Sequence, residues 1–241
     1  MTSGENRRAL ITGASGGIGR ATAIAFAAAG MDLALVGRSK EKLDVVAQAA
    51  RQKGVKAQAY PLDLAQLEGV KAGIEAIASE LGTIDILVNN AGMGYTGNLL
   101  DTPLADWQQV INLNLTSALL CIQAILPGMR DRGQGMIINI ASIAGYQAFP
   151  GWGAYNVSKA GLISLSKTLA AEEHPHGIRV VTICPGAVNT PIWDTDSVQA
   201  DFDRSRMLTP ETVAESILHT ALLPPQAVIQ ELTITPSAGA L

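Results

Sequence analysis

Cysteine, aromatic residues and charge are all scarce in this chain of 241 residues. Its 2 cysteines, Cys121 and Cys184, cannot make a framework of several disulfides, so we expect a reducing cytoplasmic setting in which both are small buried side chains. Charged residues make up 16%, the net charge is −4, and the lack of a basic stripe argues against nucleic acid as a partner. No apolar run reaches the length of a membrane span, and the polar residues 1–9 do not resemble a signal peptide.

What the chain has instead is 48% hydrophobic residues, arranged in strand-length and helix-length segments that alternate throughout. The predicted strands cover residues 8–11, 33–36, 56–61, 84–89, 136–140, 179–184 and 228–235. The predicted helices after the first one cover residues 39–53, 65–81, 102–126, 154–173 and 209–223. Ser39 is expected to cap a helix, Thr102 and Pro103 to begin the long one, and Pro127-Gly128 to end it. This alternation predicts an α/β fold with a doubly wound parallel sheet, three α/β/α layers and a single domain over residues 1–241.

A glycine-rich segment, T-G-A-S-G-G-I-G at residues 12–19, separates the first strand from the first helix. Gly13 permits a tight turn, Gly17 lets a ligand approach the backbone, and Gly19 lets the helix pack closely on the strand. The N-terminus of the helix adds N–H groups and partial positive charge, which favour a phosphate. An ordinary flexible turn could carry the same glycines, but a dinucleotide-binding unit has them at this first turn between strand and helix.

A second group of residues could carry acid–base chemistry. Tyr155 and Lys159 are four residues apart on a predicted helix and therefore share a face. A nearby ammonium in a partly desolvated site can lower the pKa of a phenol from its usual value near 10. Ser142 directly follows the fifth strand, and Asn114 lies among leucines, where a buried amide needs a partner. Taken singly, these residues could equally be a solvated helix pair, a turn residue and a satisfied helix polar group.

In this order and at these spacings, the motifs resemble those of the short-chain dehydrogenase/reductase family, in its compact, single-domain, Rossmann-like branch. The resemblance covers nearly the whole chain. It rests on Thr12-Gly13-x-x-x-Gly17-x-Gly19, Asn89-Asn90-Ala91-Gly92, Asn114, Ser142, Tyr155-x-x-x-Lys159, and Pro185-Gly186 with Thr190.

The resemblance implies that Asn114, Ser142, Tyr155 and Lys159 are the catalytic residues. Tyr155 would donate a proton to a substrate carbonyl oxygen in reduction and accept it in oxidation, and Ser142 would orient the same oxygen. Lys159 would bond the nicotinamide ribose and lower the pKa of Tyr155. Asn114 would hold a water that connects Lys159 to solvent.

The resemblance also implies a set of cofactor-binding residues. Asn90 would steady the central sheet, Ala91-Gly92 would flank the adenine ribose, and Thr190 would meet the nicotinamide carboxamide. Asp63-Leu64 would touch adenine, although a lone aspartate there could instead be a helix cap. The full set is Gly13, Ser15, Gly17, Ile18, Gly19, Arg38, Ser39, Asp63, Leu64, Asn90, Ala91, Gly92, Tyr155, Lys159, Pro185, Gly186, Val188 and Thr190.

The end of the second strand bears on the choice of cofactor. An NAD enzyme usually has Asp or Glu there, whereas this chain has Gly37 followed by Arg38, whose guanidinium suits a 2′-phosphate. We therefore expect NADP(H) to be preferred, with NAD(H) possible. Many NADP-preferring relatives have a second basic residue where this chain has Gly16, and an Arg38 that only stacks on adenine would allow both cofactors.

Three features bear on the substrate. The aromatic residues Trp152, Trp193, Tyr95 and Phe149, with Gln147, either line a pocket for an apolar group or pack in the core. The polar residues 190–207 form either a lid or a surface loop. The C-terminus lacks the Asp-Gly-Gly ending typical of relatives that reduce 3-oxoacyl carrier-protein thioesters.

We therefore expect an NADP(H)-dependent oxidoreductase that acts on the carbonyl or secondary alcohol of a small ketone, aldehyde or hydroxy acid. The alternatives are a 3-oxoacyl-carrier-protein reductase and a non-catalytic dinucleotide-binding redox sensor. No metal site is predicted, because His174, His176 and His219 lack a cluster of other ligands. A homodimer or homotetramer would form through helices 102–126 and 154–173, unless their apolar faces serve only the core.

Overall fold

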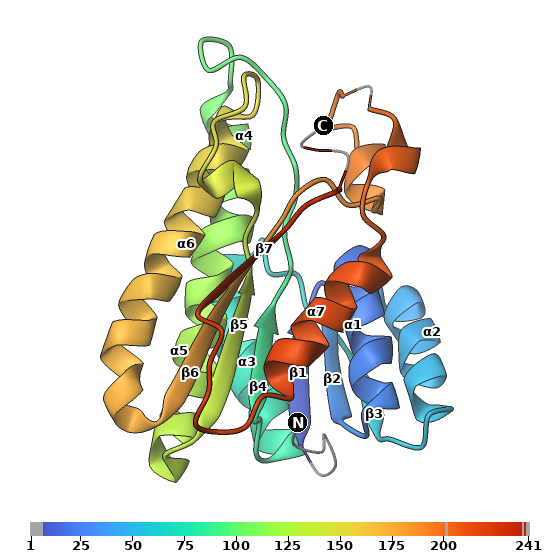
Figure 1. Ribbon diagram of the computed structural model, residues 1–241, viewed down its shortest axis with the longest axis vertical. Helices are drawn as coiled ribbons and strands as arrows, with labels where there is room; N and C mark the ends of the chain where they lie inside the picture. The colour runs from blue at the N-terminus through green and yellow to red at the C-terminus, as the bar shows by residue number, and fades with distance from the viewer. Residues whose placement is uncertain (1–6, 201, 238, 240–241) are drawn as a thin grey trace.

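The computed structural model describes residues 7–200, 202–237 and 239. Its centre is a sheet of seven strands, all parallel, in the order β3-β2-β1-β4-β5-β6-β7 (Figure 1). The strands are β1 (Arg8–Thr12), β2 (Asp32–Gly37), β3 (Ala57–Pro61), β4 (Ile86–Asn89), β5 (Gly135–Ile140), β6 (Ile178–Pro185) and β7 (Glu231–Ile234). The predicted doubly wound fold is confirmed. The chain reverses its direction of travel across the sheet between β1 and β4, and this reversal opens a crevice at their carboxyl ends.

Helices cover both faces of the sheet and complete the three layers (Figure 1). On one face lie α1 (Gly17–Ala28), α2 (Lys40–Arg51) and α7 (Pro210–Ala221). On the other lie α3 (Leu67–Leu81), α4 (Leu104–Ile111), α5 (Ser117–Arg132) and α6 (Gly153–Glu173). Each face has its own apolar core: Phe26 and Met31 lie in the first, and Ile74 and Met129 in the second. The near-continuous apolar strands are therefore buried from both sides, as parallel strands require.

Two predicted helix starts are confirmed by their caps. The Ser39 hydroxyl accepts a hydrogen bond from the Lys42 N–H at 3.3 Å, and Thr209 accepts one from the Thr212 N–H at 3.2 Å. The start predicted at Thr102 is displaced, because Thr102 donates to the Asn98 carbonyl at 2.8 Å instead of capping. Pro103 takes the cap position, and α4 begins at the next residue.

The prediction that Pro127-Gly128 ends the long helix is wrong. A proline costs the helix one hydrogen bond, but the turn beyond Pro127 is held from outside, and α5 continues to Arg132. Met129 in that turn is fully buried, and Arg132 donates to the Ile84 carbonyl at 2.8 Å. The helix ends instead at Gly133, whose φ of 63° is a left-handed conformation that glycine adopts without strain.

The continuous helical stretch Leu104–Arg132 bears on the expectation that no apolar run is as long as a membrane span. Its 29 residues are long enough to cross a membrane, and its most apolar window has a mean hydropathy of 1.6, although polar residues interrupt every apolar run. The core helices of globular proteins meet the same criterion, and this stretch packs against β4, β5, α3 and α6. Within the protein, 39% of the window is buried.

Both cysteines are free and buried, as predicted. Burial raises the pKa of Cys121 to about 12 and that of Cys184 to about 11, so each is held as a neutral thiol.

Candidate active site

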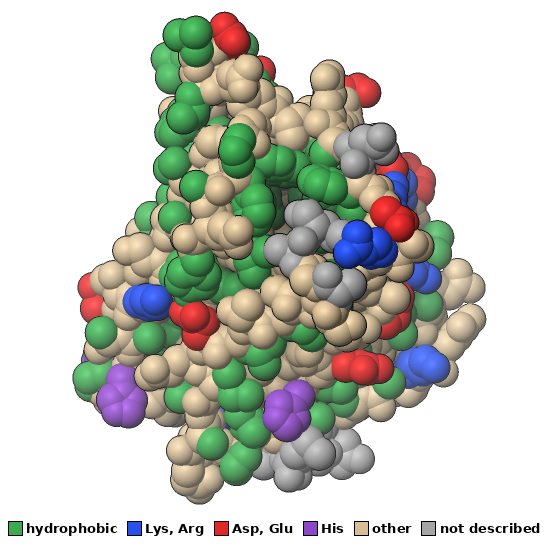
Figure 2. Space-filling view, turned by 45° about the horizontal axis from the view of Figure 1, so that its top comes forward, with side chains coloured by type: hydrophobic (Ala, Val, Ile, Leu, Met, Phe, Trp, Pro, Cys, Tyr) green, Lys and Arg blue, Asp and Glu red, His purple; other side chains and the backbone are tan. Residues whose placement is uncertain are grey.

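A cleft of about 610 Å³ lies at the carboxyl ends of the strands, at the reversal between β1 and β4. Hydrophobic side chains gather around a hollow on this upper part of the molecule (Figure 2). Most of the predicted site residues line the cleft, including three of the four catalytic candidates, Ser142, Tyr155 and Lys159. The predicted cofactor-binding residues along it are Gly13, Ser15, Gly17, Ile18, Arg38, Asp63, Leu64, Asn90, Ala91, Gly92, Tyr155, Lys159, Pro185, Gly186, Val188 and Thr190.

The glycine loop forms one wall and has the geometry that the sequence predicts. Gly13 and Gly17 have φ angles of 64° and 52°, which side chains other than glycine rarely adopt. A Cβ atom on Gly19 would lie 2.3 Å from the Gly13 carbonyl oxygen, so only glycine lets α1 begin this close to the turn. The Asn90 side-chain amide donates to the Thr12 carbonyl at 2.9 Å and thereby ties the end of β4 to this loop.

The loop offers an anion a cradle of backbone at the N-terminus of α1. Its cap residue is Gly16 and its first turn carries no acidic side chain, so N–H groups and the helix dipole face the cleft without a competing carboxylate from that turn. These features and the size of the cleft fit a dinucleotide phosphate. Gly19 lies behind this wall and supports the loop rather than lining the cleft.

Asn114 is buried beside the cleft, within a π-helical turn (Asn112–Thr116) between α4 and α5. Its Oδ1 accepts from the Met93 N–H at 2.8 Å, and its Nδ2 donates to the Met93 carbonyl at 2.9 Å and to Ser158 Oγ at 3.0 Å. The amide thus joins the loop after β4 to α6. π-helical turns often mark functional sites, and this one places the polar residue predicted from the leucine-rich segment.

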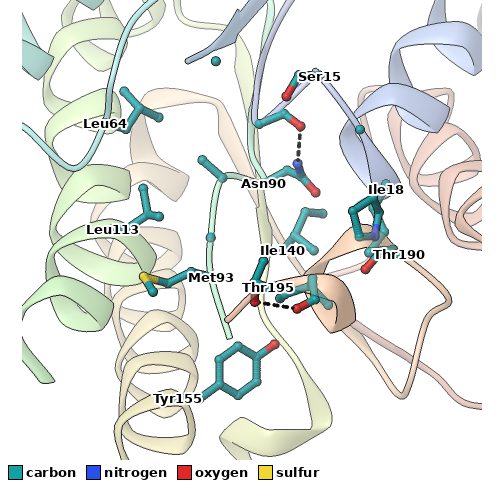
Figure 3. A pocket seen from close by; sticks show the side chains of 18 of the residues that line it. Ser15, Ile18, Leu64, Asn90, Met93, Leu113, Ile140, Tyr155, Thr190 and Thr195 are labelled. Carbon is teal, nitrogen blue, oxygen red and sulfur yellow. Dashed lines mark hydrogen bonds between the residues drawn. The ribbon is translucent and has the colours of Figure 1, made fainter. Parts of the chain in front are cut away.

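Ser142 and Tyr155 line the same part of the cleft. Tyr155 projects its hydroxyl into the cleft from α6, opposite Ile18 and Thr190 (Figure 3). Burial raises the pKa of Tyr155, and a hydrogen bond from Ser142 lowers it by a smaller amount. The expected net lowering of this pKa by Lys159 is therefore not produced by the protein's own groups, because desolvation of the phenolate outweighs the other contributions.

Lys159 lies beneath Tyr155 on the same face of α6 and is 5% exposed. Its ammonium donates to the Ile140 carbonyl oxygen at 2.9 Å and lies 5.6 Å from the centroid of the Tyr155 ring. Burial lowers the pKa of Lys159 to about 8, because the charged form loses solvation. A Cβ on Gly92 would lie 3.7 Å from the ammonium, so this glycine keeps the approach to Lys159 open.

The far end of the cleft carries the residues predicted to read the adenosine half of the cofactor. Arg38 is exposed and lines this end. The Ser39 hydroxyl is used as the cap of α2 and donates to Glu41 at 3.0 Å, so Ser39 lies outside the lining. Asp63 Oδ1 accepts from the Ala65 N–H at 3.0 Å, which fixes the turn before α3 without capping that helix.

A smaller cavity of about 100 Å³ adjoins the cleft and shares Ser142 and Tyr155 with it. Of the aromatic residues singled out in the sequence, Trp152, Trp193 and Phe149 line it, whereas Tyr95 and Gln147 do not. Sequence reasoning missed Phe202, because it lies in the irregular segment 190–207, which has no periodicity from which to place a side chain.

The segment 190–207 lies over the cleft and is tied down at two places. Ser197 donates to the Gly94 carbonyl at 2.8 Å, on the loop after β4. Arg204 donates to Asn189 Oδ1 at 2.8 Å and to the Thr190 carbonyl at 3.0 Å, and it pairs with Asp194. The segment thus has the position expected of a lid.

Within the part of the chain that the structure describes, no group of three or more His, Cys, Asp and Glu side chains could hold a metal ion. His174, His176 and His219 are exposed, on a short turn after α6 and on α7.

Comparison with known proteins places this site in a family. The sequence model of the short chain dehydrogenases matches residues 7–200. A 3-oxoacyl-(acyl-carrier-protein) reductase of Synechocystis sp. is 37% identical, and the alignment covers 99% of this chain and 98% of that protein. The structure of L-sorbose reductase from Gluconobacter frateurii with NADPH and L-sorbose has a TM-score of 0.88 and 33% identity, covering 98% of both chains. That of an alcohol dehydrogenase from Thermococcus sibiricus with 5-hydroxy-NADP has a TM-score of 0.88 and 28% identity, again covering 98% of both.

Proposed function

The chain belongs to the short-chain dehydrogenase family, and from that premise we propose that it uses NADP(H) to interconvert a carbonyl and a secondary alcohol in a small ketone, aldehyde or hydroxy acid. The observation that carries the proposal is the meeting of Ser142, Tyr155 and Lys159 at one wall of a cleft whose opposite wall is the glycine loop. A phosphate-binding loop and a proton donor that face each other across a single cleft suit a reaction between a dinucleotide and a small molecule.

In the proposed reduction, a nicotinamide held in the cleft would supply the hydride for the carbonyl carbon. Tyr155 gives its hydroxyl proton to the carbonyl oxygen, so hydride and proton together convert the carbonyl to an alcohol. Ser142 donates a hydrogen bond to the same oxygen and fixes its position. The Lys159 ammonium, 5.6 Å from the Tyr155 ring, stabilises the phenolate that forms as the proton leaves.

The preference for NADP(H) rests on Arg38, the charged side chain that follows β2 at the adenosine end of the cleft. A guanidinium makes paired, charge-assisted hydrogen bonds to a phosphate, whereas a ribose hydroxyl is better served by a carboxylate. The solved complexes of the sorbose reductase with NADPH and of the archaeal alcohol dehydrogenase with 5-hydroxy-NADP support the same choice.

Replacing the proton donor tests the reaction. Tyr155→Phe is expected to lower kcat for ketone reduction by about a hundredfold or more, because a positioned general acid contributes about that much. NADPH binding, followed by fluorescence titration, should stay within about twofold. Tyr60→Phe, the same substitution on β3 outside the cleft, is the control and should keep full turnover. A Tyr155→Phe enzyme with turnover close to that of the original would refute the assignment.

Replacing Arg38 tests the cofactor. Arg38→Ala should raise KM for NADPH about tenfold more than KM for NADH, roughly the effect of one exposed charge-assisted hydrogen bond. Arg20→Ala, which removes an exposed arginine on α1 away from the cleft, should leave the ratio of the two KM values as it was. An unchanged ratio in Arg38→Ala would exclude the assigned role.

A second candidate function is the reduction of a 3-oxoacyl thioester on an acyl carrier protein. The relative from Synechocystis sp., at 37% identity over nearly the whole chain, favours it. Assays with NADPH and either acetoacetyl-CoA or simple ketones separate the two. A kcat/KM for the thioester far above that for every ketone would establish the second candidate.

Self-association through α5 and α6 is part of the proposal. The helical stretch Leu104–Arg132 buries only 39% of its most apolar window within one chain, and Leu119 and Val157 remain 36% and 47% exposed. A second copy of the chain could cover this surface and form a homodimer or homotetramer. Light scattering after size-exclusion chromatography would give the number of copies.

A further inference from the structure

We propose that the small cavity beside Ser142 and Tyr155 is a subsite for one compact, uncharged aryl or branched alkyl group attached to the substrate carbonyl. This inference rests on the proposed function and narrows its substrate class. It favours ketones and aldehydes that carry such a group over oxo acids, because a carboxylate in this cavity would find no charged partner among the described residues and a methyl group would leave it largely unfilled.

The position of the cavity links it to the reacting group. Ser142, Tyr155 and Gly186 line both this cavity and the larger cleft, so the two hydroxyls stand at the boundary between them. A carbonyl oxygen held by both hydroxyls puts its carbon at that boundary. One substituent on the carbon then points into the small cavity, while the large cleft is the space available to the dinucleotide.

The walls are unusually rich in aromatic rings for a chain with only 4% aromatic residues. Trp152 packs edge-to-face on Tyr155 with ring centroids 5.5 Å apart, and on Trp193 at 5.7 Å. Trp193 in turn packs edge-to-face on Phe202 at 5.4 Å. These four rings form a continuous row from the proton donor to the outer end of the cavity, and a flat or compact apolar group can pack against them.

Hydrogen bonds outside the cavity hold the Trp193 ring and the backbone of Phe149. The Trp193 indole N–H donates to the Val188 carbonyl at 2.7 Å, so the ring presents an apolar surface with its polar group already satisfied. Asn156 donates to the Phe149 carbonyl at 3.1 Å and fixes the segment before α6. Such a preformed wall costs a ligand little ordering when it binds.

The described side chains that line the cavity offer no charged partner for a charged group. None of the described residues that line the cavity carries a carboxylate, an ammonium or a guanidinium. Bringing a carboxylate into such a place without a partner is costly, whereas an apolar group gains by leaving water. The substrate group that enters should therefore be neutral.

The size of the cavity limits the group. An engineered apolar cavity of about 150 Å³ in another protein accommodates benzene. The volume here is smaller, about 100 Å³, so one ring or a branched chain of similar bulk is the upper limit and has to extend to the side shared with the larger cleft, whereas a fused pair of rings is too large. The row of rings ends at Phe202, which lines the cavity and packs on Trp193.

A panel of methyl ketones tests the subsite on the full-length enzyme with NADPH. The kcat/KM for acetophenone should be about tenfold or more above that for acetone and about a hundredfold above that for pyruvate. Of the three substrates, only acetophenone has a group, its phenyl ring, that fills the cavity without burying a charge. A kcat/KM for acetone or pyruvate equal to that for acetophenone would overturn the subsite and leave the proposed function standing. Failure to reduce any carbonyl in the panel would instead count against the proposed function.

Binding is measured separately, so that the subsite is tested even without turnover. Saturation-transfer NMR should show the phenyl protons of 1-phenylethanol in contact with the protein and no comparable signal from lactate. Equal signals from the two alcohols, or none from either, would exclude the subsite.

Shortening the outer wall gives a gain of function that misfolding cannot mimic. Phe202→Ala should lower the ratio of kcat/KM for acetophenone to that for acetone by about five- to tenfold, the loss of one ring contact. It should also raise the ratio for 2-acetonaphthone over acetophenone, because the fused ring gains room. Trp107→Phe, on α4 away from the cavity, should alter neither ratio. If both ratios stay unchanged in Phe202→Ala, the ring does not form the wall of a substrate subsite.

Discussion

Gly19→Ala adds one methyl group where the glycine loop and α1 touch. In the structure, a Cβ at this position would lie 2.3 Å from the Gly13 carbonyl oxygen and 2.5 Å from the Asn90 side-chain amide. Neither neighbour can move freely, because Gly13 is already in a left-handed conformation and Asn90 is hydrogen-bonded to the Thr12 carbonyl. The added methyl must therefore push α1 away from the loop that is proposed to bind the phosphates.

Two opposing effects set the size of the free-energy change that Gly19→Ala causes. Alanine is a better helix former than glycine by about 1 kcal/mol, which favours the variant. Overpacking a tight contact costs about 1 to 3 kcal/mol, and here the clash involves backbone that cannot rotate out of the way. A clash with such backbone lies at the upper end of that range, about 2 to 3 kcal/mol, and therefore exceeds the helix gain by about 1 to 2 kcal/mol. If the shift of the loop is carried fully into the phosphate contacts, this corresponds to about a five- to thirtyfold weaker affinity for NADPH. For a chain of 241 residues, the same energy lowers Tm by about 2 to 8 °C.

Gly69→Ala is the matched control. Gly69 is the third residue of α3 as Gly19 is the third of α1, but a Cβ there would have nothing within 4 Å. It should therefore raise Tm slightly and leave NADPH affinity unchanged, since only the helix-forming gain applies. Fluorescence titration with NADPH and thermal unfolding measure both quantities. Equal NADPH affinities for the two variants would refute the close-approach argument for Gly19.

Two further predictions concern Lys159 on α6 and Asn139 on β5, whose hydrogen bonds join β4 and β5 to α6. The pH dependence of kcat/KM reports the ionisation of groups in the free enzyme. We therefore expect kcat/KM for NADPH, at a fixed ketone concentration, to fall as the pH rises through about 8, where Lys159 loses its proton. A pH profile that stays flat through that value would contradict the role of the ammonium. Asn139→Ala should lower the free energy of unfolding by about 1 to 3 kcal/mol in urea titration, because it leaves the buried Asn89 amide and Ser166 hydroxyl without the partners they have at 2.9 and 2.8 Å. The control is Asn112→Ala at a half-buried position, which removes only the solvent-exposed hydrogen bond that Gln108 donates to Asn112; a matching loss of stability there would show that the buried bonds are not the cause.

Features set by short-range spacing were predictable from the sequence. The strand, turn and helix around residues 12–19 follow from the glycines and the apolar run before them, and the structure gives Gly13 and Gly17 the positive φ angles this requires. Tyr155 and Lys159 share a face of α6 because of their four-residue separation alone. Such local rules fix where a side chain starts, and the topology of a parallel sheet then gathers the strand ends.

Features set by distant contacts were not predictable. Pro127 reads as a helix end, yet the turn beyond it is stabilised by the burial of Met129 and by the Arg132 contact with Ile84. The direction of the Tyr155 pKa shift depends on how much of the phenol is buried, which no spacing reveals. Phe202 belongs to an irregular segment and reaches the site only because Arg204 and Ser197 hold that segment across the cleft.

The proposed cofactor cleft and the aromatic cavity share a wall, so substitutions in that wall can alter cofactor affinity and substrate size together. Val188 lines the cleft, and its carbonyl holds the Trp193 indole that forms the cavity. Thr190 also lines the cleft, and its side chain lies 3.1 Å from where a Cβ on Gly17 would be. We expect a substitution in this stretch to move both walls together, because only four residues separate Val188 from Trp193. Phe202, by contrast, touches only the cavity, so altered substrate size without altered cofactor affinity is most accessible there.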